Sequence, residues 1–442
     1  MKNIFFVGIN GIGMSGLAQV MKTLNYNVSG SDLSKSYLSE KMENQGINIF
    51  SKHESKNIND VDTLVVSTAI GEDNPEYRKA KEIGTTIIKR GELLANLLNK
   101  KTGIAVAGTH GKTTTSSMLS TVLLEKDPTV VVGGIVPAIG SNARCGQSEY
   151  FVAEADESDN SFLFMEPKYS VVTNIEEDHL EKHGCLANIK KSFETFINQT
   201  SREALVCEDC PNCDVILRNP KVKTYSLINK NAFLYADNIK VENKKTYFDI
   251  YIAGKFEGQF VLSIPGQHNV YNALPVIYLA LEFGVSKDSI KESLLNFTGA
   301  KRRYDILLDR EDIKVIDDYG HHPTEIKATL QGARSIENKK ITVIFQPHRF
   351  SRVKFLLEQF EGAFDNADEL ILMPVFSAGE KDEFGITIED LLKKINHRNS
   401  KFVSSDEELE SDILNRNEPR VYIFMGAGSI SSFAHHFVEK IK

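Results

Sequence analysis

Two glycine-rich stretches have the residue types and the spacing of phosphate-binding loops. Residues 8–16, GINGIGMSG, place Gly11, Gly13 and Gly16 directly after an apolar run and before a stretch with helical spacing. Residues 108–115, GTHGKTTT, occur in the same context further along the chain. Glycines at such a strand-to-helix turn let a phosphate approach the free N–H groups at the helix N-terminus. Two loops of this kind predict two phosphate-bearing ligands.

The first loop is consistent with three interpretations. Its Gly-x-Gly-x-x-Gly spacing is that of a dinucleotide fingerprint, and Asp32 ends the next predicted strand, where it could meet a ribose hydroxyl. The same glycines could bind the diphosphate of another nucleotide, or they could form only a tight turn. Taken alone, the motif favours NAD about as strongly as it favours the other-nucleotide and tight-turn interpretations combined.

The second loop departs from the strict GxxxxGK[ST] pattern, because Val106 occupies the position of the first glycine. In the remaining segment, Lys112 could neutralise the β- and γ-phosphates of ATP, and Thr113 could bind Mg²⁺. A glycine turn with a chance Lys-Thr pair is the less favoured alternative. A dehydrogenase has no use for an ATP loop. A ligase that activates a nucleotide-linked substrate with ATP needs both loops.

Acidic and histidine residues follow two further predicted strands of the same segment. Residues 153–163 contain the carboxylates Glu154, Asp156, Glu157 and Asp159, and residues 173–184 contain Asp178, His179 and His183. Mg²⁺ prefers hard oxygen ligands. Since the carboxyl ends of parallel strands meet at one edge of a sheet, these residues favour a metal–phosphate cleft over solvated turns.

Polar residues also follow two predicted strands near the C-terminus, in residues 316–326 and 346–352. They are Tyr319, His321, His322, His348, Arg349 and Arg352. Loops in this position commonly bind ligands in open α/β sheets. Ordinary loop polarity explains these residues equally well when they are taken alone.

Short apolar runs alternate with stretches of helical spacing, which predicts parallel sheets covered by helices. The pattern restarts twice, so we expect three α/β domains over residues 1–99, 100–298 and 299–442. The first and third are expected to be Rossmann-like, and the second a P-loop ATPase domain. Residues 230–266 alternate as antiparallel strands do, which predicts a small insertion in the middle domain.

Composition narrows the functional class. The 442 residues carry 52 Lys and Arg against 60 Asp and Glu, a formal net charge of −8 without a basic block. This charge disfavours binding to nucleic acid or to an anionic membrane. No apolar run approaches the roughly 18 residues of a membrane span, and the N-terminus has no signal-peptide pattern. Together with an odd number of cysteines, five, this predicts a cytoplasmic protein.

Three of the cysteines, Cys207, Cys210 and Cys213, form the motif CEDCPNC. The motif could hold zinc or an iron–sulfur cluster if Cys185 or a histidine completed the ligand set. A closed structural zinc site needs four ligands, however, and only three cluster here. A surface turn after a strand is therefore the favoured interpretation.

Eight motifs occur in an order that resembles the Mur ligases of bacterial peptidoglycan synthesis over essentially the whole chain. They are GINGIGMSGLA, GTHGKTTT, EADESD, TNIEEDH, GQHNVYNAL, GAKRRYD, DDYGHHPTE and QPHRFSR. Within the family, GIGMSGLA and EADESDNSFL are most similar to members that join L-alanine to UDP-N-acetylmuramate. The resemblance implies these two substrates, the cofactors ATP and Mg²⁺, an acyl-phosphate intermediate, and a monomer or homodimer. The first loop would then hold the UDP sugar and the second ATP.

The resemblance also implies roles for individual residues. ATP would be bound by Gly108, Thr109, His110, Gly111, Lys112, Thr113, Thr114, His268, Asn272, and Asp317 or Asp318. The metal ligands would be Thr113, Glu154 and His179. The UDP sugar would meet Gly11, Gly13, Met14, Ser15, Asp32, Ser67 and Thr68. The reacting groups would be met by Lys112, His179, Arg302 or Arg303, Tyr319, His348 and Arg349.

Three rival functions stay open at this point. One is a related ligase that adds a whole tripeptide to the same sugar nucleotide. Another is an oxidoreductase that binds NAD through Gly11, Gly13 and Gly16. The third is a binding protein that hydrolyses ATP without forming a bond. Several Mur ligases use a carbamylated lysine at a second metal, and Lys190 and Lys191 are candidates for that position.

Overall fold

The computed structural model describes residues 2–35, 37–67, 69–416 and 418–442, which form two compact units. Unit 1 comprises Met1–Glu177, Cys185–Tyr235 and Leu274–Ile290. Unit 2 comprises Asp178–Gly184, Ala236–Ala273 and Lys291–Lys442. The chain therefore passes between the units several times, and the predicted domain boundaries at residues 99 and 298 stay a prediction.

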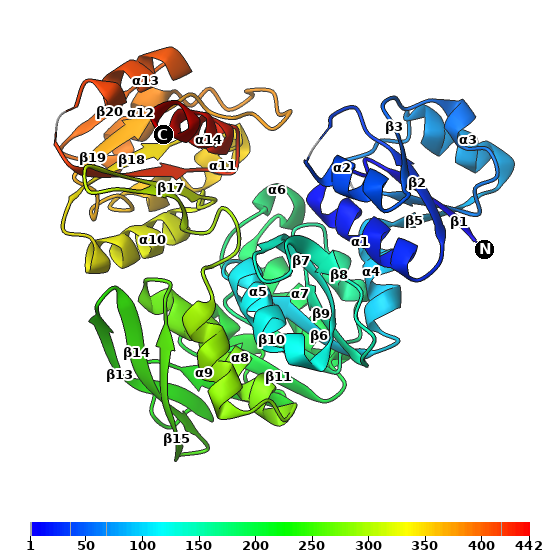
Figure 1. Cartoon of the computed structure of the whole chain (residues 1–442), viewed down its shortest axis with the longest axis horizontal. Coiled ribbons are helices and arrows are strands. Elements are labelled where there is room, and N and C mark those ends of the chain that lie inside the picture. Colours follow the sequence, from blue (N-terminus) through cyan, green and yellow to red (C-terminus); the bar gives the residue numbers. More distant parts are fainter. Residues whose placement is uncertain (1, 36, 68, 417) are drawn as a thin grey trace. The chain divides into compact units, whose positions relative to one another are not determined.

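Unit 1 begins with a five-stranded parallel sheet in the order β3-β2-β1-β4-β5 (Figure 1). Its strands are β1 (Asn3–Val7), β2 (Asn27–Ser31), β3 (Asn48–Phe50), β4 (Thr63–Val66) and β5 (Thr86–Lys89). Its helices are α1 (Ile12–Thr23), α2 (Tyr37–Asn44), η1 (Ser55–Asn57), α3 (Pro75–Ile83) and α4 (Arg90–Leu98). The strand order reverses beside β1, the position where such sheets bind nucleotides, and this confirms the Rossmann-like prediction.

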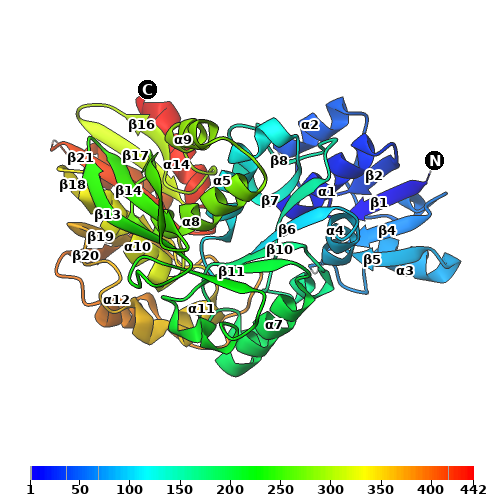
Figure 2. The same cartoon turned by 90° about the horizontal axis from the view of Figure 1, so that it is seen from below.

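A larger sheet has ten strands in the order β15-β14-β13-β12-β11-β10-β6-β9-β7-β8, of which β6, β7, β10 and β11 are labelled in Figure 2. The strands from β12 to β8 belong to unit 1, whereas β13 begins in unit 1 and continues, like β14 and β15, in unit 2. Strands β6 (Thr102–Ala107), β7 (Thr129–Val136), β9 (Tyr150–Glu154), β10 (Tyr169–Val172), β11 (Glu203–Cys207), β12 (Val222–Ser226) and β13 (Leu234–Glu242) are parallel; β8 (Ser141–Arg144) is antiparallel. The helices of unit 1 are α5 (Lys112–Val122), η2 (Leu124–Lys126), η3 (Ser161–Phe164), α7 (Leu186–Gln199) and η4 (Pro211–Val215). Helices α8 (Gln267–Glu282) and α9 (Lys287–Asn296) each have one part in unit 1 and the other in unit 2. Continuous apolar runs such as β6 are wholly buried, as a sheet covered on both faces requires.

Unit 2 contains the short helix α6 (Leu180–His183), an antiparallel hairpin and a second α/β sheet. The hairpin pairs β14 (Lys245–Ile252) with β15 (Lys255–Leu262), which confirms the antiparallel insertion predicted for residues 230–266. The C-terminal sheet has the order β16-β17-β21-β18-β19-β20. All its strands are parallel except the edge strand β16, so the Rossmann-like prediction holds apart from that edge.

Helices connect the parallel strands of the C-terminal sheet. The strands are β16 (Asp305–Asp309), β17 (Ile313–Asp318), β18 (Lys340–Phe345), β19 (Glu369–Leu372), β20 (Ser400–Phe402) and β21 (Arg420–Met425). The helices are α10 (Pro323–Ile336), α11 (Phe350–Phe355), η5 (Leu357–Phe360), α12 (Ile388–Ile395), α13 (Asp406–Leu414) and α14 (Ile430–Ile441). Helix α10 begins after His322, with Pro at its first position and Glu325 completing a capping box.

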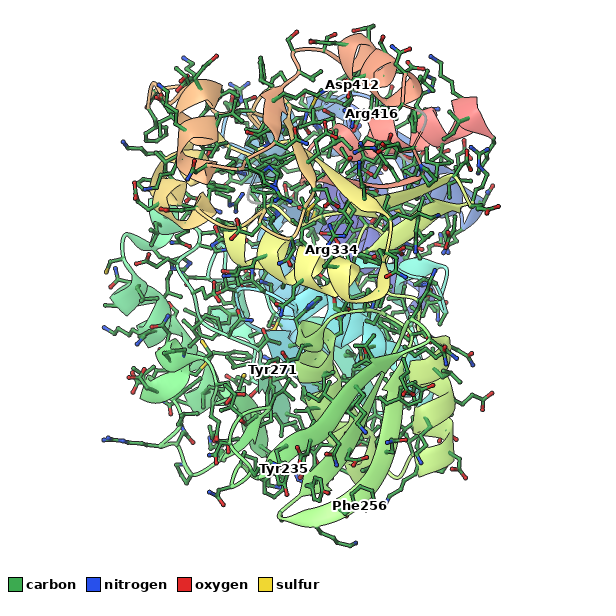
Figure 3. All side chains as sticks on the ribbon, turned by 90° about the vertical axis from the view of Figure 1, so that its left-hand side faces the viewer. Tyr235, Phe256, Tyr271, Arg334, Asp412 and Arg416 are labelled. Carbon is green, nitrogen blue, oxygen red and sulfur yellow. The ribbon has the colours of Figure 1, made fainter. Side chains whose placement is uncertain are left out.

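Ion pairs link the first residues of β19 and β21 to the end of α13. Arg416 contacts Asp412 (Figure 3). Arg416 also contacts the Glu369 carboxylate, and Arg420 Nη1 lies 3.1 Å from Glu369 Oε2. Each half-buried guanidinium thus has a carboxylate partner, which limits the desolvation cost of partly burying the charge. Among the described helices, none is both long enough and apolar enough to span a bilayer.

Candidate active site

The first glycine loop joins β1 to α1. Gly8 has a φ of +78°, and a Cβ at that position would lie 3.8 Å from Ser67 Oγ, so the end of β4 borders the loop. Asp32 Oδ2 accepts a hydrogen bond from the backbone N–H of Asn10 at 2.9 Å. Asp32 therefore holds the loop in shape, a role that the ribose interpretation of this residue did not include.

Arg90 is a residue of this loop region that sequence reasoning missed. A Cβ on Gly13 would lie 3.0 Å from Arg90 Cδ, so the arginine side chain lies directly over that glycine. Arg90 Nη2 also lies 3.3 Å from Asp156 Oδ2. The only local signal was a cation at the end of a predicted strand, which is too common to single out.

Met14, Ser15 and Thr68 are among the residues predicted to meet the UDP sugar. Met14 and Ser15 have buried side chains, and Ser15 Oγ donates to the Ile12 carbonyl at 3.0 Å. Their backbone N–H groups both donate to the Gly11 carbonyl. These two residues shape the first turn of α1, and Thr68 lies outside the described residues.

The second glycine loop joins β6 to α5 and is tightly enclosed. Gly108 has a φ of +134°, and a Cβ there would lie 2.0 Å from Thr173 Oγ1. Gly111, with a φ of +82°, directly precedes α5. Both positions need glycine, one because of crowding and conformation and the other because of the left-handed turn.

The end of β10 holds the middle of this loop through Asn174 and Glu176. Asn174 Oδ1 accepts from His110 N at 2.8 Å, and the Asn174 carbonyl accepts from Thr109 N at 3.1 Å. Glu176 N donates to Thr109 Oγ1 at 2.8 Å, and its carboxylate lies 3.3 Å from His110 Nε2. The contacts of Thr109 and His110 thus hold the second loop in its conformation.

Lys112 points into the loop. Its Nζ donates to the Gly108 carbonyl at 2.6 Å and to the Thr109 carbonyl at 3.1 Å, and it lies 2.9 Å from the Glu157 carboxylate. Burial alone would lower the pKa of Lys112, but the surrounding carboxylates outweigh it and raise the pKa. Burial raises the pKa of Glu157 to about 7, because one ammonium cannot neutralise several buried acids. The site therefore keeps a permanent cation where phosphate oxygens would bind.

Thr113 and Glu154 form an oxygen-rich pair beside Lys112. Thr113 Oγ1 lies 3.1 and 3.0 Å from the two Glu154 carboxylate oxygens, and Gly133 N donates to Glu154 Oε2 at 2.8 Å. A hydroxyl and a carboxylate are donors that suit Mg²⁺. Thr114 is half-buried in the first turn of α5.

Unit 2 contains a pocket built around Asp178 and Arg352. Arg352 Nη2 lies 3.1 Å from Asp178 Oδ1, and Arg352 Nη1 lies 3.2 Å from His348 Nδ1. Burial alone would raise the pKa of Asp178, but Arg352 and nearby histidines hold it far below its usual range. The lining side chains are Asp178, His179, Leu180, Glu181, Arg349, Ser351, Arg352, Phe355 and Leu356.

The rings next to this pocket are stacked or tilted against one another. The His348 ring stacks on the Phe376 ring, with 5.7 Å between their centroids. The centroid of the His321 ring lies 5.8 Å from that of His348 and 5.3 Å from that of Tyr319. Burial, followed by the charge of Arg352, lowers the pKa of His348 to about 4 and that of His321 to about 3. Both imidazoles are therefore neutral at pH 7.

Arg349 lies at the edge of the pocket. Its Nη1 lies 3.2 Å from Glu380 Oε1, and its φ of +68° is unusual for a residue with a side chain. Glu380 also accepts from Ser351 Oγ at 2.7 Å. A strained backbone held by such contacts is common at ligand sites.

The predicted pair Arg302 and Arg303 shares one aromatic partner. Their guanidinium carbons lie 4.9 and 5.0 Å from the centre of the Tyr319 ring. Arg302 Nη2 donates to the Gly426 carbonyl at 2.8 Å, whereas Arg303 Nη1 lies 3.2 Å from Glu325 Oε1. The structure therefore brings together three residues that the sequence placed in two separate motifs.

Asp317 and Asp318, which the sequence could not distinguish, face opposite sides of β17. Asp317 Oδ2 accepts from Ser431 Oγ at 2.5 Å. Asp318 accepts from the backbone N–H groups of Tyr304 and Gly320, both at 2.8 Å. Burial raises the pKa of Asp318 to about 6. Asp318 thus supports the turn that carries Arg302 and Arg303.

His268 and Asn272 lie in the first turns of α8. Burial lowers the pKa of His268 to about 4, with Arg303 adding to the effect and Glu325 opposing it. Asn272 is buried, and its Nδ2 donates to Asn269 Oδ1 at 3.2 Å. A neutral imidazole beside a buried amide suits a heterocyclic base.

The predicted site residues therefore fall into two groups. The glycine loops, Asp32, Ser67, Lys112, Thr113 and Glu154 belong to unit 1. The predicted residues from His268 onward belong to unit 2, as does His179, the third predicted metal ligand. Within the part of the chain that the structure describes, Cys207, Cys210 and Cys213 do not form a group able to hold a metal ion.

Family models match three consecutive parts of the chain. The Mur ligase catalytic domain matches residues 3–102, the Mur ligase middle domain residues 106–280, and the glutamate ligase domain of Mur ligases residues 302–428. The chain belongs to the Mur ligase family. A UDP-N-acetylmuramate–L-alanine ligase of Fusobacterium nucleatum is 53% identical over 456 residues, covering 100% of this chain and 97% of that protein.

Solved Mur ligases agree with this assignment. The UDP-N-acetylmuramate–alanine ligase of Thermotoga maritima has a TM-score of 0.85 at 33% identity, covering 100% of this chain and 99% of that one. A murein peptide ligase of Psychrobacter arcticus has a TM-score of 0.73 at 22% identity, covering 99% and 98%, and shows the fold alone. The Mur ligase fold predicted from eight motifs is confirmed.

Proposed function

We propose that this Mur ligase uses ATP to join the amino group of L-alanine to the lactyl carboxylate of UDP-N-acetylmuramate. The observation that carries the proposal is the phosphate loop, in which Lys112 lies inside the backbone turn and Thr113 lies against Glu154. Relatives bearing this activity in their name match the chain from end to end. The NAD interpretation leaves this second loop without a function.

The chemistry explains why ATP is needed. A carboxylate is a poor acyl donor, because its leaving group would be an oxide. Attack of the lactyl carboxylate on the γ-phosphorus forms a carbon–oxygen–phosphorus bridge and releases ADP. The alanine amine then attacks the acyl carbon, a proton leaves the nitrogen, and phosphate departs as the amide forms. The protein mainly positions the reactants and neutralises charge.

Unit 1 residues suit the phosphoryl transfer step. Lys112 is held by carbonyl oxygens and Glu157, so its charge is preorganised where the β- and γ-phosphates would lie. Thr113 and Glu154 offer the oxygen donors that Mg²⁺ requires. His179, which belongs to unit 2, is proposed for a second ion. Bound Mg²⁺ would neutralise phosphate charge during transfer.

The first glycine loop is proposed to hold the diphosphate of the UDP sugar. Gly11 and Gly13 open the N-terminus of α1, and Arg90 covers Gly13 with a guanidinium that suits phosphate oxygens. Ser67 borders the same loop. Arg90 would thus supply the first loop with a positive charge, as Lys112 does for the second loop, in a chain whose net charge is negative.

The unit 2 pocket is proposed to hold L-alanine. Asp178 could pair with the amino group, and Arg349 and Arg352 could pair with the carboxylate. Phe355 and Leu356 supply the apolar part of the lining, which suits a methyl side chain. His348 and Tyr319 are proposed to shape the same region.

The remaining unit 2 residues are proposed to serve ATP. His268 and Asn272 would meet the adenine, Asp317 or Asp318 the ribose or phosphates, and Arg302 or Arg303 the reacting phosphates. The Tyr319 ring positions both guanidinium groups. We further propose that the enzyme works in the cytoplasm, as a monomer or homodimer.

One assay separates this proposal from its rivals. Phosphate release is measured with purified protein, ATP, Mg²⁺ and UDP-N-acetylmuramate, with and without L-alanine. Release that needs every component, with an alanyl sugar nucleotide as product, is expected. A requirement for the tripeptide L-alanyl-γ-D-glutamyl-diaminopimelate instead of L-alanine would make the chain a peptide-recycling ligase. Release indifferent to both acceptors would overturn the ligase proposal.

A further inference from the structure

The motif CEDCPNC is the one sequence feature that the proposed function does not use. Its first residue, Cys207, ends β11, and its last four residues, Cys-Pro-Asn-Cys, form a turn in which Cys213 N donates to the Cys210 carbonyl at 3.0 Å. The turn sets Cys210 and Cys213 one helical turn apart, with Cys210 directly preceding the 3-10 helix η4 (Pro211–Val215). Cys210 is half-buried and Cys213 is fully buried.

The two thiols have different chemical characters. The neighbouring Cys213 thiol lowers the pKa of Cys210 to about 6, burial opposes this effect, and N–H groups of Ile175 and Asn212 assist it. The Cys210 thiolate and burial raise the pKa of Cys213. An accessible thiolate beside a protonated buried thiol is the arrangement of redox-active Cys-x-x-Cys pairs.

We propose that Cys210 and Cys213 are a redox-active dithiol that a peroxide converts into an intramolecular disulfide. The Cys210 thiolate attacks one peroxide oxygen, the oxygen–oxygen bond breaks, and a sulfenic acid forms with release of water from hydrogen peroxide. Cys213 then attacks the Cys210 sulfur and expels a second water as the sulfur–sulfur bond forms. Two thiols are oxidised by two electrons, and one peroxide is reduced.

The pair is placed to affect the phosphate loop. Cys210 Sγ accepts from Ile175 N at 3.3 Å, and Asn212 Nδ2 donates to the Ile175 carbonyl at 2.9 Å. Ile175 lies between Asn174 and Glu176, which hold the phosphate loop through Thr109 and His110.

A disulfide sulfur at Cys210 accepts the hydrogen bond from Ile175 N less strongly than a thiolate does. Disulfide formation also rearranges the Cys210 turn, so the contacts of Asn174 and Glu176 with the phosphate loop should loosen. The disulfide itself does not depend on the proposed function, whereas its effect on turnover does.

The test is cysteine mapping on the full-length protein. Reduced protein is treated with hydrogen peroxide, free thiols are alkylated, and tryptic peptides are analysed by mass spectrometry. Cleavage after Arg202 and Arg218 gives one peptide with Cys207, Cys210 and Cys213. The expected product has a Cys210–Cys213 bond and one alkylated thiol at Cys207. Oxidation of exposed Cys185 with all three peptide thiols still alkylated would overturn the proposal.

Activity supplies a second, separate readout. ATP-dependent turnover is expected to fall several-fold after peroxide and to return with dithiothreitol. Cys213→Ala and Cys210→Ser should each abolish the loss of turnover that dithiothreitol reverses. The Cys210→Ser variant keeps a side-chain oxygen that can accept the hydrogen bond from Ile175 N. Cys185→Ser is the control and should behave as the natural chain does.

A reversible loss of equal size in the Cys210→Ser variant would contradict the proposal. So would one equivalent of zinc that is released when these thiols are alkylated, because a thiolate zinc site would not form the disulfide.

Discussion

Arg352 and Asp178 are joined by a two-point ion pair, with Arg352 Nη2 lying 3.1 Å from Asp178 Oδ1 and 3.3 Å from Oδ2. The side chains are 7% and 11% exposed, so neither charge is well hydrated. The residues are 174 positions apart in the sequence. This pair defines one wall of the pocket assigned to L-alanine.

Asp178→Asn should weaken use of L-alanine more than use of ATP. Breaking a buried pair by removing one charge costs about 3–5 kcal/mol, because the other charge stays buried. We expect kcat/KM for L-alanine to fall about 100-fold or more. Initial rates with varied L-alanine and then varied ATP check the split.

Asp214→Asn is the matched control, since Asp214 is 65% exposed in its ion pair with Lys190. Such a pair contributes about 0–1 kcal/mol, so little change is expected. An Asp178→Asn enzyme with an unaltered KM for L-alanine would contradict the pocket assignment.

Lys112→Ala should remove the cation that faces the phosphates. Loss of one preorganised donor to transition-state charge typically reduces kcat about 100- to 1,000-fold. Binding of the UDP sugar, measured by calorimetry, should survive because the first glycine loop is separate in sequence. Lys126→Ala, whose Nζ donates to the Gly284 carbonyl, is the control. Near-normal turnover in Lys112→Ala would refute the role of this residue.

Arg90→Ala should raise the KM for UDP-N-acetylmuramate about 10-fold or more, since a charge-assisted contact to phosphate contributes about 1.5–3 kcal/mol. The KM for L-alanine should change less. Steady-state kinetics in both substrates, with Arg144→Ala as a control that removes an ion pair to Asp127, checks this expectation. Equal effects on both KM values would instead indicate a general structural role.

Gly108→Ala should disrupt the second loop. The new Cβ would meet Thr173 Oγ1 at 2.0 Å, and the φ of +134° is unsuitable for alanine. Gly84→Ala is the control, because its φ is +75° and nothing lies within 4 Å of the new Cβ. The control should lose about 1–2 kcal/mol from its left-handed backbone alone. Thermal unfolding should show a larger loss for Gly108→Ala, and equal losses would refute the crowding argument.

His268 should make stability depend on pH. Its pKa is lowered from 6.5 to about 4, so between these values the unfolded chain binds more protons than the folded chain. By linkage, the contribution of His268 is complete above pH 6.5 and is lost as pH falls towards 4, with a slope of at most about 1.4 kcal/mol per pH unit.

The variant His268→Gln should therefore become more stable relative to the natural chain as pH is lowered from 7 to 4.5. Urea unfolding at several pH values measures the difference. His436→Gln, on the exposed face of α14, controls for the loss of a histidine as such. A difference that does not vary with pH would disprove the burial argument for His268.

The sequence predicted the parts of the site that depend on local physics. Glycines at strand-to-helix turns, apolar runs of strand length and carboxylates at strand ends are set by conformational preference and periodicity, so both loops and their strands were predicted correctly. Likewise, the alternation of side chains along β17 requires Asp317 and Asp318 to face opposite ways. Which partner each would meet could not be read from that alternation.

Tertiary structure decided which distant side chains meet. Arg90 covers Gly13 and reaches Asp156, Asn174 holds His110, and Arg352 pairs with Asp178. These contacts depend on the order of strands in each sheet and on how loops return to it, which are set by packing of the whole core. Local sequence sets the backbone conformation and the strand or helix position of each residue, whereas long-range packing determines which distant residues it contacts.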